Sequence, residues 1–327
     1  MAKILLINPA LTPEEIYSDY GVASATLPPL GLCYIAAVLE RDLHEIKIID
    51  GVAEKISKQQ LTKRVKKYNP EIIGITAMTV GYIRALETAN LIKEIDKNII
   101  ILLGGPHVSS IPKKTFEEQD CFDIGVIGEG EYTVRELINY LEKKELTNYK
   151  AGLEKIKGLV YKNKGKTIQT SRRELIENLD ELPLPARHLL PDIKLYNLLL
   201  MNQEPNYASI VPSRGCPFQC IYCDQNVFGH KWRSFSPEYV IKEVEELVSK
   251  YGVKTVQIQD DLFTLKRERV VKFCQLLIEK NIKITWNLSS RVNLIDEKMA
   301  KILLINPALT PEEIYSDYGV ASATLPP

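Results

Sequence analysis

The first half of the chain alternates short apolar runs with longer amphipathic segments. The apolar runs are rich in Ile, Leu and Val, and they predict β-strands at residues 3–8, 45–50, 71–76, 98–103 and 123–127. The segments between them repeat apolar positions at helical spacing and predict helices at residues 30–43, 58–68, 82–96 and 132–144, with Ser57 as the N-cap of the second. Nearly continuous apolar strands that alternate with helices are typical of a parallel sheet covered on both faces. We therefore expect a doubly wound, Rossmann-like α/β domain over residues 1–145.

The pattern changes over residues 146–206, which we interpret as a connector. Residues 158–161 and 167–170 flank a turn at Gly165 and predict a small β-hairpin. The run Leu182-Pro183-Leu184-Pro185 then predicts an extended segment that proline stiffens.

Strand and helix patterns alternate again after the connector. Residues 207–212, 253–259 and 283–288 predict strands, and the intervening segments predict helices from Pro237 to about Tyr251 and over 266–279. Ser236 is the expected N-cap of the first helix, because Pro237 favours the first helical position. These β–α repeats predict a partial (β/α) barrel over residues 207–298, with its chemistry at the carboxyl ends of the strands.

The end of the chain is a copy of its beginning. Residues 299–327 repeat residues 1–29 without a single change, and structural repeats drift and recur at shorter periods. We interpret the copy, including the apparent strand at 301–306, as an artefact of sequence assembly or cloning. The informative sequence is then expected to end near Lys298.

Composition narrows the possible partners and compartment. The 327 residues include 42 Lys and Arg and 42 Asp and Glu, so the chain has no net positive charge that would attract nucleic acid or an anionic membrane. No apolar run is long enough to span a bilayer, and the N-terminus has no signal-peptide pattern. Six cysteines, three of them in one short loop, fit a reducing cytoplasm better than a disulfide framework. Cys33, Cys121 and Cys274 lie in apolar segments and are expected to be buried small hydrophobes.

The clearest chemical signal is a loop with three cysteines. Cys216, Cys220 and Cys223 have the spacing C-x3-C-x2-C, and Gly215 and Pro217 flank the first of them. Three thiolates on one loop can hold three irons of a four-iron cluster and leave the fourth iron open for chemistry. The alternative is a zinc site, but zinc sites usually have two C-x2-C pairs or paired histidines, and the sequence has no second pair.

This loop resembles the cysteine motif of the radical SAM superfamily. The resemblance implies a [4Fe-4S] cluster whose open iron chelates S-adenosylmethionine (SAM), and an electron donor such as a flavodoxin or ferredoxin. It implies that Tyr222 leans on the adenine and that Asp260 or, preferably, Asp261 contacts the SAM amino group. Arg291 then fits a contact to the SAM carboxylate. The alternatives are that Asp260 only caps a loop and that Arg291 pairs with a surface carboxylate. Members of the superfamily have six barrel strands, so three predicted strands indicate an incomplete barrel, and whether this chain is active stays open.

Polar or glycine-rich segments follow four of the predicted strands in the first domain, namely the first, third, fourth and fifth. Glycines at strand ends allow a backbone to approach a ligand closely, although any single pair can be a tight turn. Together with the connector phrase Leu-Asp-x-Leu-Pro-x-Pro, these segments resemble the cobalamin-binding domain that precedes many radical SAM domains. The residues that this resemblance assigns to cobalamin are Thr76, Met78, Thr79, Gly104, Gly105, Gly128, Glu129 and Gly130.

One feature departs from the wider B12 family. The motif D-x-H-x-x-G, whose histidine ligates cobalt, is absent from the loop after the first strand. The resemblance then implies a cobalamin whose lower face has no histidine ligand. His107, after Gly104-Gly105-Pro106, is a candidate substitute, but a histidine there is more often a loop residue that bonds backbone.

Several functions compete for this arrangement. A dinucleotide site is disfavoured because no G-x-G-x-x-G follows the first strand, whereas a flavodoxin-like regulatory module stays open. Methylthiotransferases need three further cluster cysteines, and residues 1–150 contain only Cys33 and Cys121. We expect a cobalamin-dependent radical SAM enzyme that methylates an unreactive carbon of a small molecule. The alternatives are a radical cyclase resembling the anaerobic magnesium-protoporphyrin ester cyclase, and a non-catalytic corrinoid-binding module.

Overall fold

The computed structural model describes residues 1–11, 26–143, 149–196 and 206–303, and its largest element is a seven-stranded sheet. The strands, in spatial order, are β2 (Glu45–Asp50), β1 (Lys3–Asn8), β3 (Ile72–Thr76), β4 (Ile100–Gly104), β5 (Ile124–Val126), β6 (Leu159–Asn163) and β7 (Lys166–Gln169). The first five are parallel, which confirms the doubly wound α/β prediction. The hairpin that the sequence placed in the connector, β6–β7, pairs antiparallel with β5 and extends this sheet.

Helices cover both faces of the sheet because alternate residues of each strand point to opposite sides. Leu6 of β1 packs with α2 (Leu30–Arg41) and α8 (Gly130–Leu141) on one face. Ile7, the next residue, packs with helices on the other face. The helices of that second face are α4 (Lys58–Tyr68), α5 (Tyr82–Ile95), α6 (Pro106–Ser110) and α7 (Pro112–Glu118), and the single turn α3 (Gly51–Glu54) follows β2.

The second unit is a smaller parallel sheet with helices between its strands. Its strands are β8 (Tyr207–Ile210), β11 (Thr255–Ile258) and β12 (Thr285–Leu288), with β11 in the middle. Helices α9 (Pro237–Tyr251) and α10 (Arg267–Glu279) connect them, which confirms the predicted β–α repeats. Ser236 caps α9 as predicted, since its side chain accepts a hydrogen bond from the Tyr239 N–H. A short ribbon of β9 (Ser213–Arg214) and β10 (Arg233–Ser234) brackets the cysteine loop.

The copied segment adopts a different structure from its original. Residues 301–303 belong to helix α11 (Glu297–Leu303), whereas the identical residues 3–5 belong to strand β1. The N-terminal copy is hydrogen-bonded by β2 and β3 on its two sides. At the other end, the Asp296 carboxylate accepts from the Met299 N–H at 2.7 Å and starts a helix. Of the predicted apparent strand 301–306, residues 301–303 are therefore helical, and the remainder lies outside the described residues.

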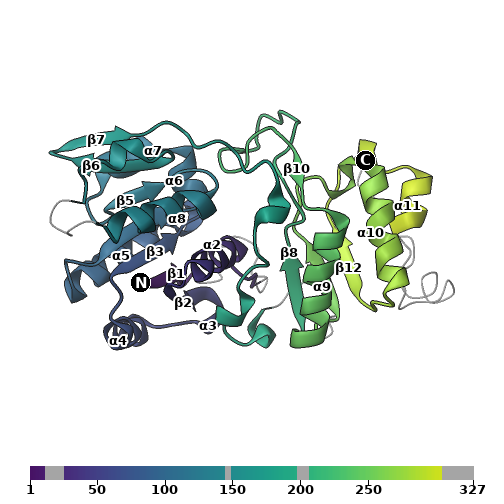
Figure 1. Ribbon diagram of the computed structural model, residues 1–327, viewed down its shortest axis with the longest axis horizontal. Helices are drawn as coiled ribbons and strands as arrows, with labels where there is room; N and C mark the ends of the chain where they lie inside the picture. Colours follow the sequence, from purple (N-terminus) through teal and green to yellow (C-terminus); the bar gives the residue numbers. More distant parts are fainter. Residues whose placement is uncertain (12–25, 144–148, 197–205, 304–327) are drawn as a thin grey trace.

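Helix α2 of the first unit contributes to the hydrophobic cluster of the second unit. Leu30, Tyr34 and Val38 of α2 pack in the same cluster as Phe235 and Val244 of the second unit. The Tyr34 and Phe235 rings stack with centroids 6.0 Å apart. Helix α2 therefore lies between the large sheet and the second unit, as Figure 1 shows.

The connector adds a buried ion pair to this contact. Arg187 donates to the Glu243 carboxylate of α9 at 2.6 Å and to the Ser209 carbonyl of β8 at 2.8 Å. Because both charged side chains are buried, the connector is packed into the second unit.

Among the residues that the structure describes, no helix has the length and apolar character needed to cross a membrane.

Candidate functional site

The cysteine loop is a compact turn between β9 and β10. Gly215 has φ +82°, and a Cβ there would clash with the Lys231 carbonyl, so the residue must be glycine. The Cys216 N–H donates to the Gly229 carbonyl at 3.3 Å, and the Cys223 N–H donates to the Cys220 carbonyl at 3.0 Å. These bonds hold the three cysteines on one curled segment, as the sequence predicts.

The three thiols are available as ligands. None of them is in a disulfide; Cys216 and Cys220 are half-buried, and Cys223 is exposed. Burial, and to a smaller extent the nearby Asp261 carboxylate, raises the pKa of the Cys216 thiol. The described residues contain no group of three His, Cys, Asp or Glu side chains arranged around a single metal ion. In a four-iron cluster each thiolate binds a different iron, so the three sulfurs need not converge on a single metal ion.

Arg291 lies directly against the cysteine loop. Its guanidinium donates to the Cys220 Sγ at 3.3 Å and lies 3.9 Å from the centre of the Phe218 ring. A cation beside a thiolate ligand lowers the energy of its negative charge. Arg291 follows the third strand of the second unit, and in the structure it contacts the cysteine loop rather than a surface carboxylate.

The two neighbouring aspartates differ in environment. The Asp260 side chain is buried, and its two oxygens accept from Ser213 Oγ at 2.6 and 2.7 Å. Its Oδ1 also accepts from the Leu262 N–H at 2.7 Å, which makes Asp260 a loop cap that ties β11 to β9. Asp261 is solvent-exposed, and its carboxylate is near enough to the Cys216 thiol to contribute to the raised pKa of that thiol. This arrangement favours Asp261 over Asp260 as a ligand contact. Tyr222 is 89% exposed on the same loop.

A cavity of about 310 Å³ lies at the carboxyl ends of the parallel strands. Gly104 borders open space, because a Cβ on it would meet nothing within 4 Å. Gly105 has φ +97°, and its Cβ would lie 2.8 Å from the Ala77 carbonyl oxygen. The cysteine loop closes the other side with Val227 and Phe228. Six of the eight predicted cobalamin residues line this cavity, namely Thr76, Gly104, Gly105, Gly128, Glu129 and Gly130.

Two predicted cobalamin residues lie outside that lining. Met78 is 54% exposed, and Thr79 Oγ1 lies 3.3 Å from the His107 Nδ1. The His107 ring is buried and stacks on Tyr82 with centroids 3.8 Å apart. Burial lowers the pKa of His107. This placement favours a packing role for His107 over a cobalt ligand.

Sequence reasoning missed a cluster of four buried charges between the cavity and the cysteine loop. Glu129 and Glu131 pair with Arg214 at 2.8 and 2.6 Å, and Glu129 also pairs with Arg233 at 2.8 Å. Burial lowers the pKa of Arg214, but the carboxylates of Glu131 and Glu129 outweigh it and raise the pKa. The available signal was the arginine directly before Gly215-Cys216 and the acidic pair in Gly-Glu-Gly-Glu.

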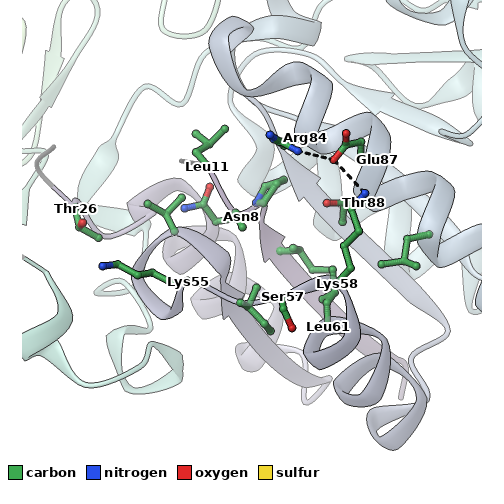
Figure 2. Close-up of a pocket in the computed structure, with 16 residues that line it drawn as sticks. Asn8, Leu11, Thr26, Lys55, Ser57, Lys58, Leu61, Arg84, Glu87 and Thr88 are labelled. Atoms are coloured by element: carbon green, nitrogen blue, oxygen red, sulfur yellow. Dashed lines mark hydrogen bonds and ion pairs between the residues drawn. The ribbon is translucent and has the colours of Figure 1, made fainter. Parts of the chain in front are cut away.

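A second cavity, of about 480 Å³, lies on the opposite face of β1. Figure 2 shows Arg84 and Lys58 pointing toward Glu87 at its rim, with nitrogen–oxygen distances of 2.8 and 3.6 Å. Its wall includes Ile7 and Leu61. None of the predicted cofactor residues lines it, so we do not assign it to the cofactor site.

Comparison with known proteins agrees with this geometry. The B12 binding domain family matches residues 20–138, and the Radical SAM superfamily matches residues 210–308. The chain therefore combines a B12-binding domain with a radical SAM domain that follows it.

Its relatives include an uncharacterized methyltransferase (PH0819) of Pyrococcus horikoshii, with 39% identity over 92% of this chain and 62% of the relative. The anaerobic magnesium-protoporphyrin IX monomethyl ester cyclase of Rubrivivax gelatinosus is 28% identical over 91% of this chain and 52% of its own length. The chain thus spans between half and two thirds of these two relatives. Among solved structures, the cobalamin-dependent SAM radical enzyme OxsB matches with a TM-score of 0.73 and 20% identity, over 94% of this chain and 42% of that chain. At that identity the match supports the fold alone.

Proposed function

We propose that this chain carries the two cofactor sites of a cobalamin-dependent radical SAM enzyme that methylates an unreactive carbon of a small molecule. The observation that carries the proposal is the shared cavity. Its walls come both from the glycine-rich strand ends, at Gly104 and Gly128, and from the cysteine loop, at Val227 and Phe228. A ligand in this cavity would therefore face a cluster held on that loop.

The residues of the chain have separate tasks in this proposal. Cys216, Cys220 and Cys223 would each hold one iron, and Arg291 would stabilise the charge beside Cys220. The exposed Asp261 carboxylate would accept hydrogen bonds from the SAM amino group. The cavity beside Gly104 would take the nucleotide tail of the corrinoid and exclude water from it.

The bound cofactors supply the difficult chemistry. With all three bound, the cluster held by Cys216, Cys220 and Cys223 would supply the electron for reductive cleavage of SAM, and the corrinoid in the cavity beside Gly104 would supply the methyl group for the substrate carbon. Each cleavage consumes one electron, so the proposal includes a flavodoxin or ferredoxin as electron donor and a reducing cytoplasm as compartment. A radical cyclase is the second candidate, and it is favoured by the similarity to the cyclase of Rubrivivax gelatinosus along most of this chain.

Anaerobic reconstitution of the full chain with iron, sulfide and hydroxocobalamin tests the proposal. The wild-type chain is expected to release 5′-deoxyadenosine from SAM under reduction, and Cys216→Ala is expected to lose both the cluster spectrum and this release. Cys121→Ala is the matched control, because Cys121 is a buried thiol of the first unit and lies outside the loop. Release by Cys216→Ala at the wild-type rate would refute the ligand assignment. Retention of cobalamin without any SAM cleavage would instead favour a corrinoid-binding module.

A further inference from the structure

The cysteine loop is fastened to the large sheet by buried charges. The Glu129 carboxylate follows β5, and it accepts from Arg214 at 2.8 Å and from Arg233 at 2.8 Å. Arg214 directly precedes the loop and Arg233 directly follows it. The four side chains of the cluster, including Glu131, are 3–5% exposed. Two positive and two negative charges thus compensate one another out of contact with water.

Glu129 also binds the connector. Its Oε2 accepts from the Ile176 N–H at 2.9 Å, and Arg233 donates to the Ile176 carbonyl at 2.8 Å. Arg233 further donates to the Phe228 carbonyl inside the loop at 3.0 Å. One carboxylate therefore joins the strand end, the connector and both ends of the loop. Both of its oxygens are occupied by these bonds, so they are not free to bind a corrinoid.

A second contact fastens the loop just after its last cysteine. The Asp224 carboxylate accepts from the Ser110 hydroxyl at the end of α6. Asn226, two residues further on, accepts from Arg172 of the connector at 3.0 Å. The segment that contains the three cysteines is thus held to the first unit at both ends.

We propose that Glu129 is a positioning residue, which holds the cysteine loop through Arg214 and Arg233 at a fixed place over the glycine-rich cavity. The role rests on the proposed function, because a fixed loop sets the separation between a cluster on the loop and a corrinoid in the cavity. It replaces the direct cobalamin contact that the sequence resemblance assigns to this residue.

Hydrogen exchange on the metal-free full chain tests the loop contact without any cofactor. In Glu129→Gln the loop amides of residues 215–232 are expected to exchange at least tenfold faster, while the amides of β1 and β3 stay within twofold of wild type. Glu177→Gln is the matched control, since Glu177 pairs with Lys231 of the same loop but both side chains are 60% or more exposed. It is expected to leave loop exchange within twofold. An unchanged loop in Glu129→Gln, or an equal increase throughout the large sheet, overturns the proposal.

The distance between the cofactors is the second readout. In the reconstituted chain, spin–spin coupling between cob(II)alamin and the reduced cluster is expected to give one narrow distance distribution in wild type and in Glu177→Gln. In Glu129→Gln that distribution is expected to broaden, with iron content unchanged, because the cysteines are intact. An identical distribution in Glu129→Gln overturns the positioning role. If no cobalamin binds at all, the proposed function fails, whereas the exchange experiment still decides the loop contact.

Discussion

Two adjacent glycines at the end of β4 provide a sharp test of the proposed cobalamin cavity. Gly104 borders open space in the cavity of about 310 Å³, whereas Gly105 has φ +97° and a Cβ position 2.8 Å from the Ala77 carbonyl. Gly104→Ala is expected to raise the free energy of unfolding by about 0.4–1 kcal/mol, because it restricts only the unfolded chain. Gly105→Ala is expected to lower it by about 1–3 kcal/mol, because the backbone at Gly105 has φ +97° and ψ −176°, a region that is essentially restricted to glycine.

A larger side chain at Gly104 is expected to weaken cobalamin binding without unfolding the chain. Gly104→Leu places a branched side chain in the cavity without a clash at Cβ, so the fold is expected to persist while cobalamin affinity falls at least tenfold, which is about 1.4 kcal/mol. Urea denaturation followed by circular dichroism measures the stability of each variant, and visible absorbance after gel filtration measures the retained cobalamin. A Gly104→Leu variant that folds and binds cobalamin as tightly as wild type would show that the corrinoid lies elsewhere.

Three further predictions follow from buried polar groups. Glu243→Ala leaves the buried Arg187 without its partner and is expected to lower the free energy of unfolding by about 3–5 kcal/mol in urea denaturation; a loss below 1 kcal/mol would contradict the buried pair. Asp260→Ala is expected to lower the free energy of unfolding by about 1–3 kcal/mol, because the Ser213 and Leu262 donors lose their acceptor. Asp261→Ala, at an exposed position, is expected to change it by less than about 0.5 kcal/mol and to weaken SAM binding in equilibrium dialysis. Equal losses of stability in the two variants would refute this division of roles. Because burial lowers the pKa of His107, the unfolded state binds the proton of this histidine more readily, so stability should fall as the pH drops below about 6.5, the ordinary pKa of a histidine. His107→Asn should flatten that dependence in urea titrations at pH 7.5 and 5.5, and an unchanged slope would assign it to other groups.

Local signals predicted the elements well. The helix predicted at 58–68 is α4 (Lys58–Tyr68), since Ser57 and Gln60 form a capping box and Asn69 ends the helix in the left-handed conformation. Pairing between distant strands has no comparable local signal. The β6–β7 hairpin was therefore predicted as a hairpin, but its place beside β5 was not. The copied segment shows the same limit. Residues 3–5 lie in β1 between two partner strands, whereas the identical residues 301–303 are helical.

In the candidate site, too, contiguous motifs could be predicted from the sequence and contacts between distant residues could not. The cysteine spacing and the glycines at strand ends are contiguous motifs, so the sequence predicted them. The pair of Arg214 and Glu129 joins residues 85 positions apart, and in a sequence buried charges look the same as surface charges. The difference between Asp260 and Asp261 depends on which of two neighbours points inward after β11, and this follows only from the packing of the second unit.

The most direct test of the account is electron paramagnetic resonance of the anaerobically reconstituted, reduced full chain, recorded with and without SAM. The chain is expected to give the signal of a reduced [4Fe-4S] cluster whose g-values shift when SAM is added, because one iron carries no protein ligand. A chain that binds zinc at the three sulfurs, or a cluster whose signal does not respond to SAM, would contradict it.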